Sequence, residues 1–170
     1  MRLRTILFFV AALTAAGPAM AELTKEFTLT AGIANGCAIG TVRTGHYGDI
    51  DLGTLSGVTG GTAEAELISS GGTGLLLDCT PGMSVTVAAG AGGQPNGSVR
   101  QLVSDIDTQK RLPYQLFANG SSVPWTSDAI PLSFPVGTSR QRLPIRARAM
   151  LTGPIAGGRY TDLVQVTVAW

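Results

Sequence analysis

Short alternating segments recur along most of this chain, and their recurrence restricts the fold more than any other feature. They are separated by Gly, Pro, Asn and Ser, and no stretch carries the apolar stripe of an amphipathic helix. Short strands at this spacing, with turn signals between them, are typical of an all-β sandwich or barrel. The predicted strands cover residues 37–43, 49–55, 62–68, 74–79, 83–89, 111–118, 129–134, 142–151 and 160–170.

The last predicted strand has an apolar face that nothing later in the sequence covers. Val164, Val166, Val168 and Trp170 alternate with small or polar residues up to the end of the sequence. An immunoglobulin-like sandwich normally continues from such a strand, through a hairpin, into one more strand that covers its edge. An exposed edge of this kind is an aggregation hazard unless another strand pairs with it. We therefore expect an incomplete sandwich.

A second strand without an obvious partner is predicted near the amino end. In the stretch ELTKEFTLTAGIANGC, residues 22–37, the side chains of Phe27, Leu29, Ala31 and Ile33 alternate with Thr, Gly and Ala. This is the period of a half-buried β-strand. Because the mature chain is expected to begin a few residues earlier, the strand lies at a free end and needs a surface for its apolar side.

The first 21 residues have the three parts of a secretory signal. Arg2 and Arg4 form a basic region, residues 6–16 are apolar, and the stretch 19–21 is a small-x-small cleavage site. The apolar run is shorter than the ~20 residues that span a bilayer. A retained membrane anchor is the alternative interpretation. We predict a signal peptide over residues 1–21 and a soluble, exported protein.

Removal of 21 residues from 170 would leave 149, the size of one domain. Two of the 12 basic residues and none of the 11 acidic ones lie in the predicted signal, so the mature charge is −1. This charge gives no reason to expect a nucleic acid or a membrane as partner. Charged residues make up only 14% of the chain, and its 23 glycines suit a β-rich extracellular protein with many tight turns.

The chain has two cysteines, Cys37 and Cys79. In an exported protein the oxidising compartment favours a disulfide between them, and two lone thiols are the alternative. Closing this loop would stabilise the fold by about 4 kcal/mol on the chain-entropy model.

Residues that could perform catalysis or hold a metal are few. His46 is the only histidine, so a triad or a histidine metal site would have to centre on it, and its Gly-flanked polar stretch favours an exposed loop. Asp49 with Asp51, and Asp105 with Asp107, are spaced so that each pair shares one face of a strand. They could bind a hard cation or form an acid–base pair, although solvated charges explain them equally well. We expect no enzyme, no cofactor and no metal.

A basic stretch overlaps the predicted strand over residues 142–151. It contains Arg140, Arg142, Arg146 and Arg148, and over residues 145–149 the arginines should face one way and the apolar side chains the other. Such a stretch is either a docking patch for an acidic partner or a charged outer face that discourages edge-to-edge pairing. We favour the second interpretation.

From residue 22 onward the chain resembles the spore coat protein U domain, found in subunits of archaic (Csu-type) chaperone–usher pili. Each shared motif is weak alone, but together they follow the family's order along nearly all of the chain, and the closing Gly-x-Tyr-x-Asp turn into a strand is the most specific. The motifs are Gly36-Cys37, LGTLSG (52–57), LLLDCTPG (75–82), LPYQLFA (112–118), VPW (123–125) and GGRYTDLVQVTVAW (157–170).

The resemblance implies a structural subunit of an extracellular pilus, which serves surface attachment and biofilm formation. Subunits of this family look like immunoglobulin folds that lack the last strand, which leaves a groove beside the carboxyl-terminal strand. A periplasmic chaperone lends a strand to the groove until, at an outer-membrane usher, the amino-terminal extension of the next subunit replaces it. No nucleic acid or small-molecule substrate is implied.

Carried over by position, the resemblance divides the chain into a donor-strand extension, residues 22–35, and a pilin domain, residues 36–170. It assigns the donor side chains to Phe27, Leu29, Ala31 and Ile33. It assigns one wall of the acceptor groove to Val164, Val166, Val168 and Trp170, and a stapling disulfide to Cys37 and Cys79.

The sequence departs from the family at Ala31, which is small among larger donor side chains. The stretch FANGSSVPW (117–125) is also shorter and more polar than in relatives. A mature chain of one domain leaves no room for the extra binding domain of the family's tip adhesins, so a polymerising subunit is expected.

Two other functions stay open at this point. One is a self-contained secreted binding module or spore-surface protein, in which residues 27–34 pair within their own chain. The other is a small secreted hydrolase that uses His46 with Asp49 or Asp51.

Overall fold

The computed structural model describes residues 25–40 and 45–170. The predicted signal peptide and positions 41–43 of a predicted strand lie outside these residues. Contacts divide the chain into two units, Met1–Ile33 and Ala34–Trp170. In the first unit, residues 25–33 belong to no strand.

Over the described ranges, 25–40 and 45–170, the fold is all-β: fourteen strands and no helix, and every paired strand is antiparallel. The predicted fold class is therefore confirmed. The largest sheet has the order β13 (Tyr160–Thr161), β8 (Arg100–Ser104), β9 (Arg111–Ala118), β12 (Ile145–Leu151), β3 (Gly61–Glu66).

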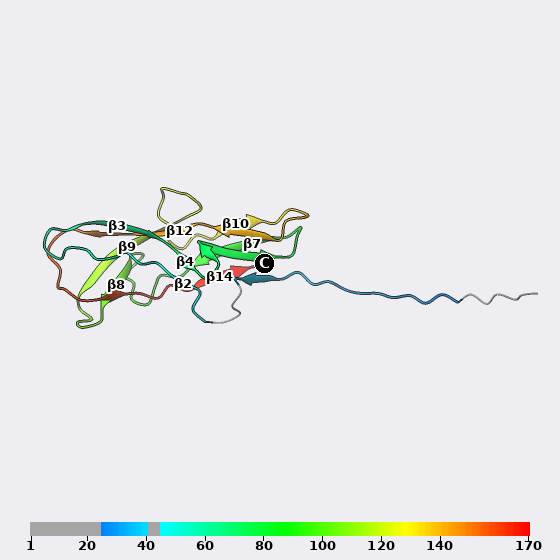
Figure 1. The fold of residues 1–170 in the computed structure, drawn as a ribbon, viewed down its shortest axis with the longest axis horizontal. Coiled ribbons are helices and arrows are strands. Elements are labelled where there is room, and N and C mark those ends of the chain that lie inside the picture. The colour runs from blue at the N-terminus through cyan, green and yellow to red at the C-terminus, as the bar shows by residue number, and fades with distance from the viewer. Residues whose placement is uncertain (1–24, 41–44) are drawn as a thin grey trace, which may run out of the picture. The chain divides into compact units, whose positions relative to one another are not determined.

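Three smaller sheets have three strands each. Their orders are β1 (Cys37–Ile39), β6 (Leu75–Cys79), β11 (Arg140–Leu143); then β10 (Ile130–Ser133), β7 (Ser84–Ala89), β14 (Val166–Ala169); and finally β2 (Gly48–Asp49), β4 (Ile68–Ser69), β5 (Gly72–Thr73). Figure 1 shows β7 and β14 side by side, in the register Val168 opposite Val87.

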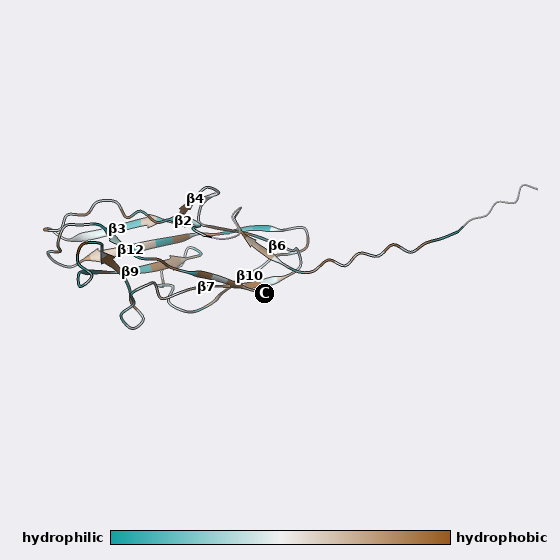
Figure 2. Cartoon of the chain, turned by 90° about the horizontal axis from the view of Figure 1, so that it is seen from below, coloured by the Kyte–Doolittle hydropathy of each residue, from teal (hydrophilic) through white to brown (hydrophobic). Residues whose placement is uncertain are grey.

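One core holds the sheets together, and it follows from the alternation of the sequence. Buried side chains recur at every second position of β6, β7, β9 and β12, and they form a single cluster. The largest fully buried side chain is Phe134, which follows β10. Figure 2 shows the contrast in hydropathy: β7 is banded in brown, whereas β3, at the edge of its sheet, is pale and teal.

The chain passes between sheets at three points where the sequence predicts one continuous strand. Residues 62–68 divide at Leu67: β3 pairs with β12, whereas β4, which begins at Ile68, pairs with β2 and β5. Residues 142–151 divide at Pro144, since proline has no N–H for a ladder: β11 pairs with β6, whereas β12 pairs with β9 and β3. Residues 160–170 divide between Thr161 and Val166: β13 pairs with β8, whereas β14 pairs with β7. All three single-strand predictions are wrong at these crossings.

One further strand prediction needs correction, and one five-residue strand was not predicted. The predicted strand over 49–55 is reduced to β2, and residues 50–55 lie in no strand. There the Asp51 side chain accepts a hydrogen bond from Gly53 N–H (2.8 Å), and Gly53 has a φ of 70°, which breaks the extended conformation. Strand β8, by contrast, was not predicted, because its sequence RQLVS has no clear alternation.

Candidate functional site

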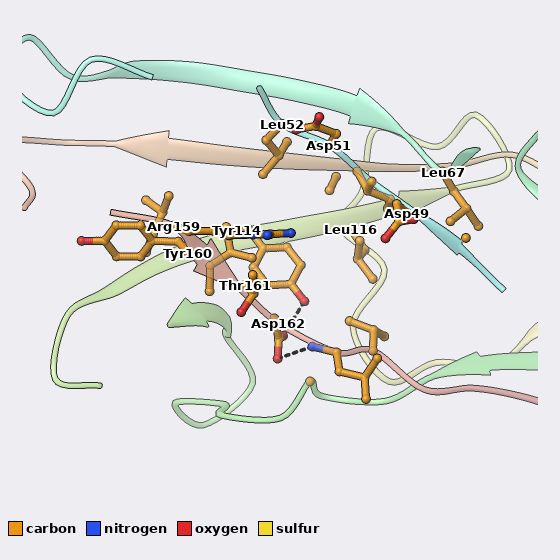
Figure 3. A pocket seen from close by; sticks show the side chains of 18 of the residues that line it. Asp49, Asp51, Leu52, Leu67, Tyr114, Leu116, Arg159, Tyr160, Thr161 and Asp162 are labelled. Carbon is orange, nitrogen blue, oxygen red and sulfur yellow. Dashed lines mark hydrogen bonds between the residues drawn. The ribbon is translucent and has the colours of Figure 1, made fainter. Parts of the chain in front are cut away.

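An open cavity of about 1870 Å³ lies within the second unit. One wall comes from the stretch between Gly45 and Gly57, and the opposite wall from Ile155 to Val166. Strands β9 and β12 supply part of the lining between them, including Tyr114 and Leu116 (Figure 3). The volume exceeds the roughly 300–1,000 Å³ of small-molecule pockets, and is large enough for a segment of chain.

The two walls share one feature: their backbone lies mostly outside the strands. Residues 50–57 and 162–165 belong to no strand, and the outer edge of β14 has no partner in the described part of the chain. At one end the walls meet, where Ile155 N–H donates to Gly57 O (2.9 Å). The cavity is therefore an opening between two stretches of chain that lie mostly outside the strands and meet at one end.

The lining combines apolar and polar side chains. Half-buried side chains on both walls pack against the buried core. These are Ile50, Leu52 and Leu55 on one wall and Val164 and Val166 on the other. Asp49, Asp51 and Arg159 also line the cavity and are exposed at its mouth. This arrangement suits an extended segment with apolar side chains on one face.

The predicted groove residues on the carboxyl-terminal strand take three different positions. Val164 and Val166 line the cavity. Val168 is half-buried and packs against the core, outside the lining. Trp170 follows the end of β14 with 63% of its surface exposed.

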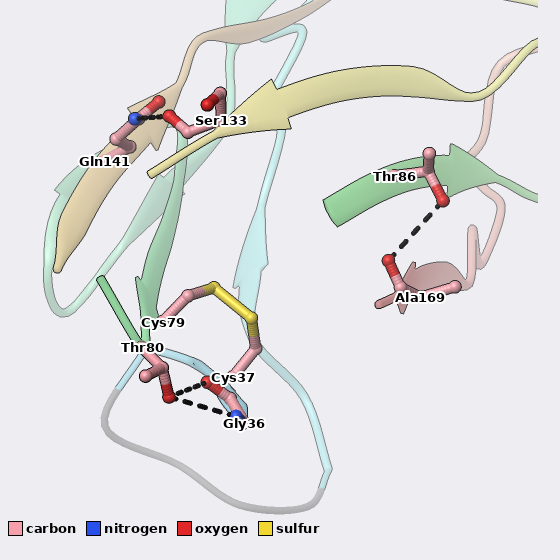
Figure 4. The surroundings of a disulfide bond; sticks show 8 residues. All are labelled: Gly36, Cys37, Cys79, Thr80, Thr86, Ser133, Gln141 and Ala169. Carbon is pink, nitrogen blue, oxygen red and sulfur yellow. Dashed lines mark hydrogen bonds between the residues drawn. A yellow bond between two sulfur atoms is a disulfide. The ribbon is translucent and has the colours of Figure 1, made fainter. Parts of the chain in front are cut away.

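A disulfide joins Cys37 and Cys79, as predicted, and fastens β1 to β6. The two cysteines are direct cross-strand partners, and Thr80 adds contacts beside them: its N–H donates to Gly36 O (3.0 Å). Its Oγ1 accepts from Gly36 N–H (3.0 Å) and donates to Gly36 O (3.3 Å) (Figure 4). Strand β1 has only three residues, and its Ile39 lines the cavity. The disulfide thus fixes a short strand at the border of the opening.

The turn between β13 and β14 contains a polar centre that the sequence analysis missed. Asp162 accepts hydrogen bonds from Tyr114 Oη (2.6 Å), Gly93 N–H (2.7 Å) and Leu163 N–H (2.9 Å). Figure 3 shows the Tyr114 hydroxyl group and the Asp162 carboxylate pointing toward each other. Burial raises the pKa of the Tyr114 phenol well above its usual range, and the hydrogen bond to Asp162 and that residue's charge act in the same direction.

The neighbouring Arg100 is buried, although the sequence gives no sign of it. Its guanidinium donates to four backbone carbonyls at the end of β7 and in the loop after β9. The carbonyls belong to Ala89 (3.3 Å), Gly90 (2.8 Å), Trp125 (2.6 Å) and Thr126 (2.7 Å). Burial lowers the pKa of Arg100, and nearby Tyr114 and Asp162 oppose this shift. Each of its three guanidinium nitrogens donates to at least one carbonyl, so Arg100 ties these backbone segments together.

The amino-terminal segment exposes the apolar side chains singled out as donors. Phe27, Leu29 and Ile33 are 89%, 88% and 91% exposed, and Ala31 is exposed as well. An exposed large apolar side chain is unremarkable alone. Three at alternating positions in one short segment are a candidate for contact with another surface.

The candidate catalytic residues lie at the surface. His46 Nε2 is 3.1 Å from Asp49 Oδ1, with both side chains mostly exposed. Asp51 and Asp107 accept hydrogen bonds from backbone N–H groups two residues later, as turn-forming aspartates do. Within residues 25–40 and 45–170, no three His, Cys, Asp or Glu side chains gather to hold a metal ion. In the same ranges no helix is long and apolar enough to span a membrane.

The first two arginines of the basic stretch contact β6 and the turn before it. Arg140 forms an ion pair with Asp78 (2.5 Å). Arg142 donates to the carbonyls of Thr73 (2.5 Å) and Gly71 (2.6 Å). Both side chains therefore interact with their own domain.

The other two arginines pack on the outer face of the five-stranded sheet. Arg146 and Arg148 both pair with Glu64, and their guanidinium groups lie 4.8 and 5.0 Å from the ring centre of Phe117. Residues 145, 147 and 149 of the same strand are buried. The alternation predicted for this stretch is confirmed, and the arginines form a charged outer face tied to neighbouring strands.

A comparison with protein families shows which family the chain belongs to. The Spore Coat Protein U domain matches residues 23–167. The chain belongs to this family. A comparison with curated proteins found no match.

The Spore Coat Protein U domain described above also resembles a solved structure. The solved structure is a chain in the crystal structure of the CsuC–CsuE chaperone–tip adhesion subunit pre-assembly complex, from archaic chaperone–usher Csu pili of Acinetobacter baumannii. The TM-score is 0.52 and the identity 19%, over 81% of this chain and 40% of that chain. This likeness concerns the fold. The present chain spans two fifths of that chain's length.

Proposed function

We propose that this chain is a structural subunit of an extracellular chaperone–usher pilus and that it polymerises by donor-strand complementation. The observation that carries the proposal is the cavity beside the free edge of β14, with apolar side chains on both walls, together with an exposed alternating apolar segment in the same chain. The family, and the likeness to a chain from a chaperone–usher pilus complex, support the same function.

In this proposal the donor strand of one subunit enters the cavity of the next. Phe27, Leu29, Ala31 and Ile33 face the apolar lining, and the donor backbone pairs with the free edge of β14. Val164 and Val166 form part of the wall, Val168 extends it along β14, and Trp170 covers its end. An added strand of this kind supplies main-chain hydrogen bonds for affinity and alternate side chains for specificity.

The burial of the larger donor side chains favours assembly. Phe27, Leu29 and Ile33 are almost fully exposed in the free segment. Their burial contributes roughly 5–9 kcal/mol in total, from about 1.5–3 kcal/mol each. Ala31 adds less because its side chain is a single methyl group. Since donor and acceptor lie on different parts of one chain, repetition of the contact is head-to-tail and builds a filament.

The remaining partners follow from the same proposal. The subunit is exported, held in the periplasm by a chaperone that fills the cavity with its own strand, and passed to an outer-membrane usher. The assembled pilus lies on the cell surface and serves attachment and biofilm formation. The role is structural, with no catalytic step.

A mixing experiment with two disabled variants tests the proposal. Leu29→Asp should remove the donor, and Val166→Asp should block the acceptor wall, so each variant alone should stay monomeric by light scattering. Their mixture should form a one-to-one dimer that grows no further, because one intact donor and one intact acceptor remain. A mixture that stays monomeric, or a single variant that forms long fibres, would contradict head-to-tail complementation.

A further inference from the structure

Tyr114 and Gly93 donate hydrogen bonds to Asp162 at the turn before β14. We propose that Tyr114 and Asp162 are positioning residues for donor-strand binding: they hold residues 162–165 as an open wall and keep this segment off the floor of the cavity. The inference rests on the proposed function. We call Asp162, Tyr114, Gly92 and Gly93 the carboxylate clamp.

The clamp stands where the chain leaves one sheet for another. Thr161, the last residue of β13, pairs with Val103 of β8, and Val166, the first of β14, pairs with Ala89 of β7. The four residues between them belong to no strand. On the β14 side, Gly90 N–H donates to Gln165 O (2.8 Å). On the β13 side, the hydrogen bonds that the Asp162 side chain accepts from Tyr114 and Gly93 hold the segment in place.

The glycine-rich loop is shaped for this carboxylate. Gly92 has a φ of 88°, and a Cβ atom at this position would lie 2.2 Å from Asp162 Oδ2. Gly93 N–H donates to the other carboxylate oxygen, Oδ1 (2.7 Å). A side chain at position 92 would therefore push the carboxylate away, so the loop and Asp162 are fitted to each other.

Arg100 fixes the end of β7, which pairs with the start of β14. It donates to the carbonyls of Ala89 and Gly90, the residues opposite Val166 and Gln165. Both sides of the junction are thus fastened by polar groups, while the segment between them carries Val164 toward an apolar cavity.

Without the clamp, residues 162–165 would be driven to close over the cavity. An apolar wall beside an apolar floor gains free energy by closing over it, because closure removes both surfaces from water. A donor strand binds only the open form, so its apparent dissociation constant rises in proportion as the open fraction falls. The clamp therefore acts on the association step, through the fraction of subunits whose cavity is open.

Peptide-binding kinetics on the full chain test this role. The acceptor is the exported full chain carrying Leu29→Asp, which removes its own donor, and the probe is a fluorophore-labelled peptide of residues 22–35. Tyr114→Phe deletes only the hydroxyl group and should slow association about tenfold, the effect of one hydrogen bond to a charged group. Asp162→Ala should slow association further. Asp162→Asn should recover much of the rate, since its Oδ1 still accepts from Gly93 and Leu163.

The control is Glu64→Gln, which removes a carboxylate bound to two arginines on the outer face, away from the cavity lining. Rates are measured well below the melting temperature of every variant, so that a loss of stability alone leaves them unchanged. Wild-type association in both Tyr114→Phe and Asp162→Ala, or equal slowing by Glu64→Gln, would overturn the inference. If the Leu29→Asp acceptor with an intact clamp binds no peptide, the proposed function itself fails.

Discussion

Leu29→Asp should abolish fibre formation while leaving the domain folded. Leu29 is 88% exposed in the free segment, so the substitution removes no contact from its own domain, and the melting temperature of the monomer should not change. In the assembled form the same side chain would face the apolar lining of the next subunit. Because Leu29 is exposed in the monomer and would be buried only after assembly, the substitution tests assembly and not folding.

The expected loss has two parts. The donor forfeits the burial of leucine, about 1.5–3 kcal/mol. A carboxyl group in an apolar site must also be neutralised, and raising its pKa from about 3.9 to neutrality costs about 4 kcal/mol. The sum, about 6 kcal/mol, weakens each link by about four orders of magnitude.

Thr30→Asp is the matched control, because the alternation places position 30 on the opposite face of the same strand. Light scattering and electron microscopy of purified subunits should show fibres for the wild type and Thr30→Asp and none for Leu29→Asp. Normal fibres from Leu29→Asp, or equal disruption by Thr30→Asp, would refute the assignment of the donor face.

Three further predictions concern the domain itself. Cys79→Ser should lower the free energy of unfolding by about 4 kcal/mol and reduce the yield of exported protein; unchanged yield and denaturant midpoint would show that the disulfide is dispensable. Gly92→Ala should destabilise the fold by about 1 kcal/mol or more, because it strains a φ of 88° and crowds Asp162, whereas Gly97→Ala lacks the second effect and should cost less by thermal melting. Stability should fall as the pH rises above about 10: burial raises the folded-state pKa of Tyr114, so the phenol favours folding below the unfolded-state pKa and loses that contribution as the unfolded chain ionises. Tyr114→Phe should flatten this alkaline decline, and an identical decline would contradict the assignment.

The strands that the sequence predicts well are those whose burial alternates strictly. In β7 and β12, every second side chain is buried, and the period alone locates them. The disulfide was equally predictable, since the chain has only two cysteines. Alternation fails for β8, where the buried Arg100 breaks the apolar pattern, and it overstates the segment after β2, where Asp51 and Gly53 form a turn.

The carboxylate clamp shows what periodicity cannot reveal. Asp162 binds Tyr114, 48 residues earlier, and Gly93, 69 residues earlier. Nothing local in the sequence joins these positions, because the contact exists only once the glycine-rich loop folds over the turn before β14. The Gly-x-Tyr-x-Asp motif marked the place, and the structure supplied its partners. The cavity likewise depends on two walls that are about 100 residues apart in the chain.

Thermal melting with a donor peptide tests the central claim most directly. The domain without its extension, residues 35–170, is refolded with its disulfide and titrated with a peptide of residues 22–35. A ligand that binds only the folded domain raises its stability with concentration, so the melting temperature should rise markedly, and a Leu29→Asp peptide should lose the effect. A domain that is already stable and whose melting temperature ignores the peptide would show that the cavity accepts no strand in trans.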